Sequence, residues 1–376
     1  MTRTAKSAWR LPPRKPHGLE GMDMQDRREF LKTFAVAGAG AATLLAQNSN
    51  LPKNYKTGRL DVHHHFELPP AGGAGRGGGR GGRGGVSAWT PEQSLEQMDK
   101  FNIGFAMLSH PGDGDQVMDA EKGAAFARKI NEFGAKVMDD HPQRFGLFAV
   151  LPMPDIDGTL KEIEYAFDTL KADGIGTLSN FGEKWPGDPK YMPIWQELNR
   201  RKAVVFVHPF VNKCCRHLVE GVNDAVIEFD IDTTRAITSL LYNGVLSKCP
   251  DVRFIVNHSG AAVPALSGRI KDRVPGAATD RFGPPPSNHE GMNANIPDGV
   301  FAELRKLYYE CAHATYPMPV AALTKLVPPS QLLFGTDYPA EPVESTVDHL
   351  NDSYPPEVLR VLERGNAERL FPRLKA

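Results

Sequence analysis

Short apolar runs alternate with longer amphipathic segments along most of this chain. The short runs have the length and the flanking turns of buried strands, whereas apolar positions in the longer segments recur at helical spacing. The pattern predicts eight strands, at Leu60 to His64, Gly104 to Leu108, Phe145 to Leu151, Gly174 to Leu178, Val204 to Val207, Phe254 to Val256, Leu307 to Glu310 and Leu332 to Phe334. The clearest predicted helices are Thr90 to Asn102, Ala120 to His141, Thr159 to Lys171, Met192 to Arg201 and Thr233 to Lys248.

This order of elements predicts the fold class. Strands that alternate with helices form a parallel α/β sheet with right-handed crossover connections. Eight such strands favour a TIM-like (β/α)8 barrel over residues 51–376. A doubly wound open sheet is the competing architecture. No G-x-G-x-x-G motif follows any expected strand, which disfavours the dinucleotide-binding form of that sheet.

Residues 1–50 have the features of a leader rather than of a folded element. Arg27 and Arg28 precede a weakly apolar run from Phe34 to Leu45, an arrangement that resembles a twin-arginine export signal. The run is shorter than the roughly 20 residues of a membrane-spanning helix, so no stable membrane anchor is expected. The sequence therefore predicts export to the periplasm by the machinery that recognises such signals. An ordinary amphipathic N-terminal helix is the alternative.

The composition is that of a globular protein without a strong overall charge. Of 376 residues, 41% are hydrophobic, and 44 basic residues nearly balance 45 acidic ones, which gives a formal net charge of −1. This balance offers no general electrostatic basis for binding nucleic acid or an anionic membrane. The Gly/Arg-rich segment 71–85 lacks apolar side chains, so we expect a mobile loop there, whose arginines could gather an anionic substrate.

The first expected strand ends in three consecutive histidines. Side chains alternate across a strand, so His63 and His65 should share one face while His64 points to the other. Two imidazoles on one face can bind the same metal ion. By the same alternation, Asp61 should lie on the face of His63 and His65, one step deeper, as a supporting or core residue. A histidine cluster in a surface turn is the alternative.

Three further polar residues follow the ends of other expected strands. His208 ends the fifth strand, His258 follows the sixth and Asp337 follows the eighth. The carboxyl ends of barrel strands meet at the face where barrel active sites are built, so these side chains should lie near His63 and His65. Each one alone has a structural alternative. Together, three or four nitrogen and oxygen ligands are the set that a catalytic zinc requires.

With these motifs the chain resembles the amidohydrolase superfamily, and within it the aminocarboxymuconate-semialdehyde decarboxylase-like group of metal-dependent carboxy-lyases. The resemblance covers about residues 59 to 371. It implies that His63, His65, His208 and Asp337 bind one divalent metal ion, zinc foremost and manganese as the alternative. It also implies that His258 is a catalytic residue that does not bind metal and that Asp337 shares in catalysis. The segments that carry it are 61–65, 182–188, 197–209, 232–238 and 334–339.

The reaction that this resemblance favours is decarboxylation of a small, aromatic or enolic, carboxylic acid. The same ligands could instead serve a hydrolase of an ester, lactone or amide, in which a metal-bound water attacks a carbonyl group. A metal-dependent binding protein without turnover is a third hypothesis. A homodimer is a possible assembly of this chain. Pocket candidates, each with simple packing as its alternative, are Phe66, His110, Ser179, Asn180, Trp185, Phe210, Cys214 and Tyr338.

Overall fold

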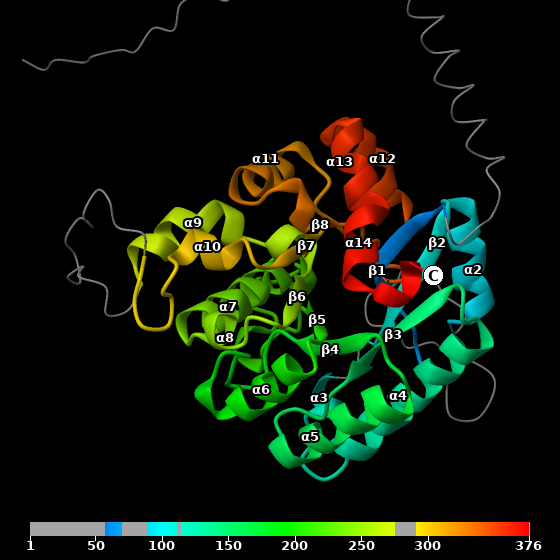
Figure 1. Ribbon diagram of the computed structural model, residues 1–376, viewed down its shortest axis with the longest axis horizontal. Helices are drawn as coiled ribbons and strands as arrows, with labels where there is room; N and C mark the ends of the chain where they lie inside the picture. Colours follow the sequence, from blue (N-terminus) through cyan, green and yellow to red (C-terminus); the bar gives the residue numbers. More distant parts are fainter. Residues whose placement is uncertain (1–56, 70–88, 111–113, 275–290, 376) are drawn as a thin grey trace, which may run out of the picture. The chain divides into compact units, whose positions relative to one another are not determined.

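The computed structural model describes residues 57–69, 89–110, 114–274 and 291–375 (Figure 1). Within them, eight parallel strands form one sheet in sequence order, each hydrogen-bonded to the next. This order differs from that of a doubly wound sheet, in which the strand order reverses, and the predicted TIM-like barrel is confirmed. The strands are β1 Arg59–His65, β2 Ile103–Ser109, β3 Phe145–Val150, β4 Gly174–Leu178, β5 Val204–His208, β6 Arg253–Val256, β7 Tyr308–Glu310 and β8 Leu332–Leu333.

The first and last strands meet in a short seam that brings the barrel close to closure. The backbone N–H of Val62 donates to the carbonyl oxygen of Phe334 at 3.0 Å. Farther along, the N–H of His65 donates to the carbonyl oxygen of Tyr338 at 2.7 Å. Because β8 itself has only two residues, much of the seam is formed by the segment that follows it.

Helices lie around the outside of the strands (Figure 1). Their starts follow local rules, as α2 illustrates: Thr90 and Gln93 bond each other's backbone N–H in a capping box, and Pro91 occupies the first turn. The helices are α2 Pro91–Lys100, α3 Gly114–Val117, α4 Gly123–Asp140, α5 Ile156–Glu164, α6 Met192–Arg200, α7 Glu228–Tyr242, α8 Val245–Lys248, α9 Val263–Asp272, α10 Val300–Leu304, α11 Pro317–Leu326, α12 Glu344–Ser353, α13 Pro356–Arg360 and α14 Asn366–Leu370.

The barrel interior is filled by one apolar cluster. Its side chains come from β1, β2, β3, β5, β6 and β8, and α14 and the turn after it add four more. Burial of each large side chain stabilises the fold by about 1.5–3 kcal/mol. This cluster leaves the carboxyl ends of the strands for polar side chains. Its buried members are Leu60, Val62, Phe105, Met107, Phe148, Val204, Phe206, Ile255, Leu333, Ala367, Leu370, Phe371 and Leu374.

All eight predicted strands are present, with ends that differ by at most one residue. Two helices differ from prediction in their continuity as well as in their ends. The expected helix Thr159 to Lys171 begins earlier, at Ile156, and continues as a π-helical turn over Tyr165–Thr169. The expected helix Thr233 to Lys248 is divided, because Gly244 adopts a left-handed φ of 75° between α7 and α8.

Two predicted segments lie outside the described residues: the leader at 1–50 and the Gly/Arg-rich segment at 71–85. Both therefore stay predictions. Among the helices that the structure does describe, none has the length and apolar character needed to cross a membrane.

Candidate metal centre

A β-bulge in β1 decides which way its histidines point. Asp61 pairs with Ala106 of β2, and His64 pairs with Leu108. Between these two pairs β1 has one residue more than β2, which is the signature of a bulge. Strict alternation of side chains therefore fails in this part of the strand.

The bulge separates Asp61 from His63. Val62 packs in the interior cluster, and the His63 ring lies 4.9 Å from the ring of Phe206, so both side chains point inward. Asp61 lies instead beside His64, with Oδ2 3.1 Å from His64 Nδ1. The prediction that Asp61 shares the face of His63 is therefore wrong, because alternation assumes an unbroken register with the neighbouring strand.

Asp61 and His64 together fasten β1 to its surroundings. Asp61 accepts hydrogen bonds from Thr336 Oγ1 at 2.6 Å and from Thr336 N at 3.1 Å. His64 Nε2 lies 2.9 Å from Ser94 Oγ on α2. Both side chains are fully buried. They hold the turn before Asp337 and the helix α2 in place, which is a structural role.

The four expected ligands converge at the carboxyl ends of β1, β5 and β8. One donor atom from each of His63, His65, His208 and Asp337 lies within 4.8 Å of the others. The Nε2 atoms of His63 and His65 are 3.0 Å apart. Asp337 Oδ1 lies 2.8 Å from His65 Nε2 and 3.2 Å from His63 Nε2. All four side chains are buried.

In each of the three histidines, the Nδ1 atom contacts a polar partner that holds the ring in place. Nδ1 of His63 lies 3.0 Å from Glu310 Oε1, and Nδ1 of His65 lies 2.8 Å from Ser109 Oγ. Nδ1 of His208 lies 2.8 Å from the carbonyl oxygen of the next residue. Partners of this kind fix the orientation of a ring and leave Nε2 for a metal ion.

The turn after β8 positions Asp337 through an uncommon backbone conformation. Asp337 has a φ of 61°, in the left-handed region that non-glycine residues seldom adopt. Two positions earlier, a Cβ on Gly335 would lie 2.3 Å from Glu310 Oε2 and 2.9 Å from His63 Cβ. Only glycine leaves room here for the carboxylate that holds His63.

Charges within this cluster fit a divalent cation. Burial raises the pKa of Asp337 and of Glu310, but His63, together with His258 and other hydrogen-bond donors nearby, outweighs burial and lowers the pKa of both. Burial lowers the pKa of His63, yet the two carboxylates outweigh it and raise the pKa to about 10. The two buried carboxylates therefore require positive charge nearby. Without a metal ion, protonated histidines supply this charge. Asp337 Oδ1, buried and without a hydrogen-bond partner, is free to bind a metal ion.

The other two histidines of the cluster favour the neutral form. Burial lowers the pKa of His65, and burial together with the neighbouring His65 and His63 lowers the pKa of His208 well below its usual value. A histidine must be neutral to bind a metal ion, so these two rings need lose no proton.

His258 lies at the edge of the cluster. Its Nε2 is 3.5 Å from Asp337 Oδ2 and its Nδ1 is 3.7 Å from Asp230 Oδ1. Burial lowers its pKa, but its interactions with these two carboxylates and the charge of Glu310 outweigh burial and raise the pKa to about 9. Its backbone N–H donates to Glu310 Oε1 at 2.6 Å, which anchors the residue at a φ of 49°.

Three site residues escaped the sequence analysis. Glu310 holds both His63 and His258, His313 Nε2 lies 2.9 Å from Asp337 Oδ2, and Asp230 faces His258. Glu310 could have been identified from the sequence, because it ends the seventh predicted strand as His208 ends the fifth. Its position at a strand end therefore pointed to the same face of the barrel.

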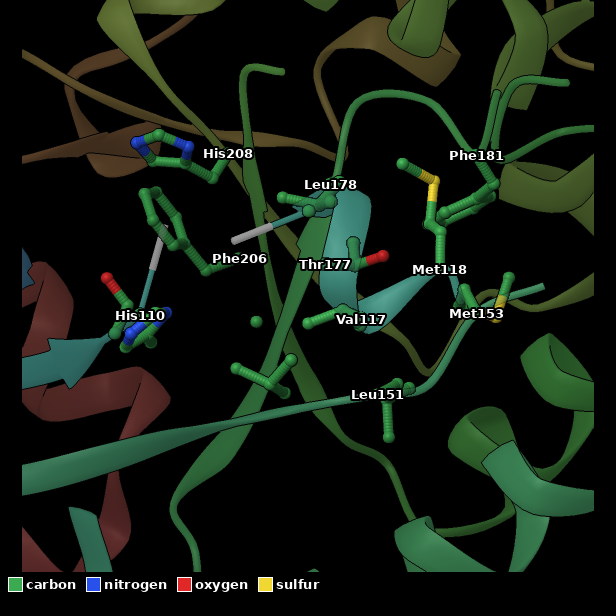
Figure 2. A pocket seen from close by; sticks show the side chains of 14 residues that line it. His110, Val117, Met118, Leu151, Met153, Thr177, Leu178, Phe181, Phe206 and His208 are labelled. Atoms are coloured by element: carbon green, nitrogen blue, oxygen red, sulfur yellow. The ribbon is translucent and has the colours of Figure 1, made fainter. Parts of the chain in front are cut away.

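A largely apolar pocket opens beside His208. Figure 2 shows His208 and Phe206 at one side of it and Met118, Phe181 and Met153 at the other. Its residues come from β2 to β5 and from the loops that follow them. Ligand pockets of this composition hold an apolar body and orient it through a few polar groups. The lining residues are Ser109, His110, Gly114, Val117, Met118, Val150, Leu151, Met153, Gly176, Thr177, Leu178, Phe181, Phe206 and His208.

Of the eight pocket candidates from sequence, this pocket includes only His110. Ser179, Asn180 and Trp185 instead gather around Asp232, whose carboxylate accepts a hydrogen bond from each of them. Contact of any of the eight candidates with a substrate stays a prediction. The remaining four candidates are Phe66, which is fully buried, Phe210, Cys214 and Tyr338, whose ring lies 5.2 Å from that of His64.

Barrel enzymes with histidine and carboxylate side chains gathered at their strand ends perform metal-assisted chemistry. The geometry of this site therefore indicates a metal-dependent barrel enzyme. The chain belongs to the amidohydrolase family, whose sequence model matches residues 60–373. The 6-methylsalicylic acid decarboxylase of Penicillium expansum is 32% identical over 334 residues, which cover 84% of this chain and 97% of that protein.

Two solved structures share the barrel. The 2,6-dihydroxybenzoate decarboxylase from Rhizobium has a TM-score of 0.71 at 21% identity, covering 85% of this chain and 99% of that one. The 5-carboxyvanillate decarboxylase of Novosphingobium aromaticivorans, complexed with manganese and 4-hydroxy-3-methoxy-5-nitrobenzoic acid, has a TM-score of 0.71 at 17% identity, covering 86% and 100%. The expected resemblance to the decarboxylase branch is confirmed, and the carboxy-lyase expectation is favoured over the hydrolase.

Proposed function

We propose that this protein is a metal-dependent decarboxylase of a small aromatic carboxylic acid that bears an oxygen next to the carboxylate. The observation that carries the proposal is the convergence of one donor atom from each of His63, His65, His208 and Asp337 beside an apolar pocket. The relatedness to the 6-methylsalicylic acid decarboxylase, along nearly the whole length of that protein, supports this reaction over hydrolysis.

One divalent ion would be held by His63, His65, His208 and Asp337. When bound, it supplies Lewis-acid chemistry and a template for two neighbouring oxygens of a substrate. Three imidazoles and one carboxylate suit zinc, and manganese, which the solved 5-carboxyvanillate decarboxylase contains, is the alternative. Elemental analysis of the purified protein distinguishes the two metals.

The aromatic ring would lie in the apolar pocket beside His208. Its walls are mostly aliphatic, thioether and aromatic side chains, which favour a planar apolar body. Because the pocket adjoins one of the four ligands, a ring held there keeps its carboxylate near the metal centre. Positioning of this kind lowers the entropic part of the barrier.

His258 would manage the proton. Decarboxylation breaks the bond between the ring and the carboxylate carbon, releases carbon dioxide and forms a carbon–hydrogen bond at the same ring atom. His258 Nε2 is buried, lacks a hydrogen-bond partner and lies beside Asp337 Oδ2. An imidazolium with an uncommitted N–H can donate to that carbon, and Asp337 stabilises its charge.

The test is a substrate panel with metal-loaded protein. Hydroxybenzoic acids, including alkyl-substituted salicylic acids, are compared with esters and lactones, and carbon dioxide release is measured alongside loss of substrate. We expect carbon dioxide in equal amount to the acid consumed, and none from metal-free protein. Turnover of esters or lactones alone, abolished by His63→Ala, would instead establish a hydrolase, and binding without any turnover would establish a binding protein.

Export through a twin-arginine signal is also part of this proposal, and it rests on Arg27, Arg28 and the apolar run that follows them. This route transports proteins that have already folded, which suits a protein that acquires its metal first. Replacing both arginines with lysine should retain the full-length precursor in the cytoplasm, as measured by cell fractionation. Normal periplasmic delivery of the double variant would contradict it.

A further inference from the structure

A second set of possible metal ligands lies beside the first and shares Asp337 with it. His258, His313 and Asp337 offer two imidazole nitrogens and one carboxylate oxygen within 4.8 Å of one another. Asp337 Oδ2 lies 2.9 Å from His313 Nε2 and 3.5 Å from His258 Nε2. Two histidines with one carboxylate form a donor set that proteins use for zinc.

The two oxygens of Asp337 face different partners. Oδ1 lies next to the Nε2 atoms of His63 and His65, whereas Oδ2 lies next to His258 and His313. A carboxylate in this position can bind one metal ion with each oxygen. Bridged pairs of this kind hold their ions about 3.5–4 Å apart.

His258 and His313 supply what such a second ion needs. The side chain of His258 is only 9% exposed, and its buried Nε2 atom has no hydrogen-bond partner. A buried polar atom without a partner calls for an explanation, and a metal ion would provide one. The side chain of His313 is 35% exposed, so the site is open to ions from solvent.

We propose a second, weaker divalent-cation site formed by His258 Nε2, His313 Nε2 and Asp337 Oδ2, with Asp337 bridging it to the first. The second site has fewer histidines and only a shared carboxylate, so it fills after the first. The site itself does not depend on the reaction proposed above.

Filling this second site has a consequence that does rest on the proposed function. The ion takes Nε2 of His258, which is the atom that delivers the proton to the substrate. Excess metal should therefore inhibit the enzyme by about 10²–10⁴-fold at full occupancy, the usual contribution of a positioned acid or base. One bound ion would activate the protein, and a second would switch it off.

The experiment is a titration of the metal-free protein with Mn²⁺, followed by calorimetry and by electron paramagnetic resonance. We expect two equivalents to bind in two steps. The second step should produce the exchange-coupled spectrum of a carboxylate-bridged pair in place of a single-ion spectrum. His313→Ala should bind one equivalent and retain the single-ion spectrum at any Mn²⁺ concentration.

Two further variants serve as controls. His217→Ala removes an exposed histidine that also lies near a carboxylate, 3.5 Å from Asp224, and it should still bind two equivalents. His313→Gln preserves a polar side chain in case the alanine variant fails to fold, and it should also lose the second equivalent. Saturation of the wild-type protein at one equivalent, or an exchange-coupled pair that persists in both His313 variants, would overturn the proposal, whichever substrate the enzyme proves to use.

Discussion

The site has two halves that are built on different physical principles. In the polar half, β1, β6, β7 and β8 provide charged side chains that bond one another, such as the pair of His63 and Glu310. In the apolar half, β2 to β5 and their loops provide the walls of the pocket, such as Met118 and Met153. His208 belongs to both, because it offers a ring nitrogen to the cluster and also lines the pocket.

This difference indicates that the polar half is rigid and that the apolar half can adapt its packing. In the polar half, Glu310 holds both His63 and His258, and Asp337, His258 and His313 all have a positive φ that only a well-determined structure maintains. The apolar half includes thioethers, which repack at little cost in free energy. We expect the first half to determine the chemistry and the second to determine the substrate.

The largest effect should come from replacing His63, and its neighbour His64 in β1 provides the comparison. His63→Ala should abolish turnover, and metal affinity should fall by more than the 10–100-fold typical of residues that only support a ligand. His64→Ala should retain the metal but destabilise the fold by about 1–3 kcal/mol, because Asp61 and Ser94 lose a partner. Metal analysis and thermal unfolding measure both. Metal loss in the His64 variant would contradict the inward and outward assignment.

The next effect separates metal binding from proton transfer within the polar half. His258→Asn should retain fold and the first metal ion while kcat falls by about 10²–10⁴-fold, because the proton donor is removed. Elemental analysis at stoichiometric metal, together with kcat, provides the measurement. If the variant loses its first metal ion, His258 is a ligand of that ion and the assignment of roles is reversed.

The smallest effect should come from the apolar half. Met118→Ala removes part of one pocket wall, so KM should rise by roughly tenfold while kcat and metal content change little. Met318→Ala, at a residue 81% exposed on α11, is a matched control that should leave KM unaltered. A tenfold fall in kcat without a change in KM would show that the pocket wall also aligns the reacting group.

The barrel and four of its strand-end residues could be predicted because each depends on local sequence. Buried parallel strands read as short apolar runs, and a polar residue at the end of such a run is conspicuous, as His208 is after Val204 to Val207. The convergence of these residues then follows from the barrel itself.

Other parts of the site depend on contacts between distant segments, which a single sequence does not show. The bulge that turns Asp61 away from His63 arises from the register between β1 and β2, and both readings fit the same string of residues. Met118 and Phe181 reach the pocket from loops, where no periodicity indicates direction. Ser179 and Asn180 occupy strand-end positions as expected, but their side chains bond Asp232.

The seam between β1 and β8 gives the metal centre a mechanical role. His63 and His65 stand on one side of the seam and Asp337 on the other, where its N–H donates to the carbonyl oxygen of His63 at 2.8 Å. An ion bound by all three joins the first strand of the barrel to the segment after the last, much as a crosslink closes a long loop. Removing the ion should therefore speed hydrogen exchange along this seam before it affects the strands on the opposite side of the barrel.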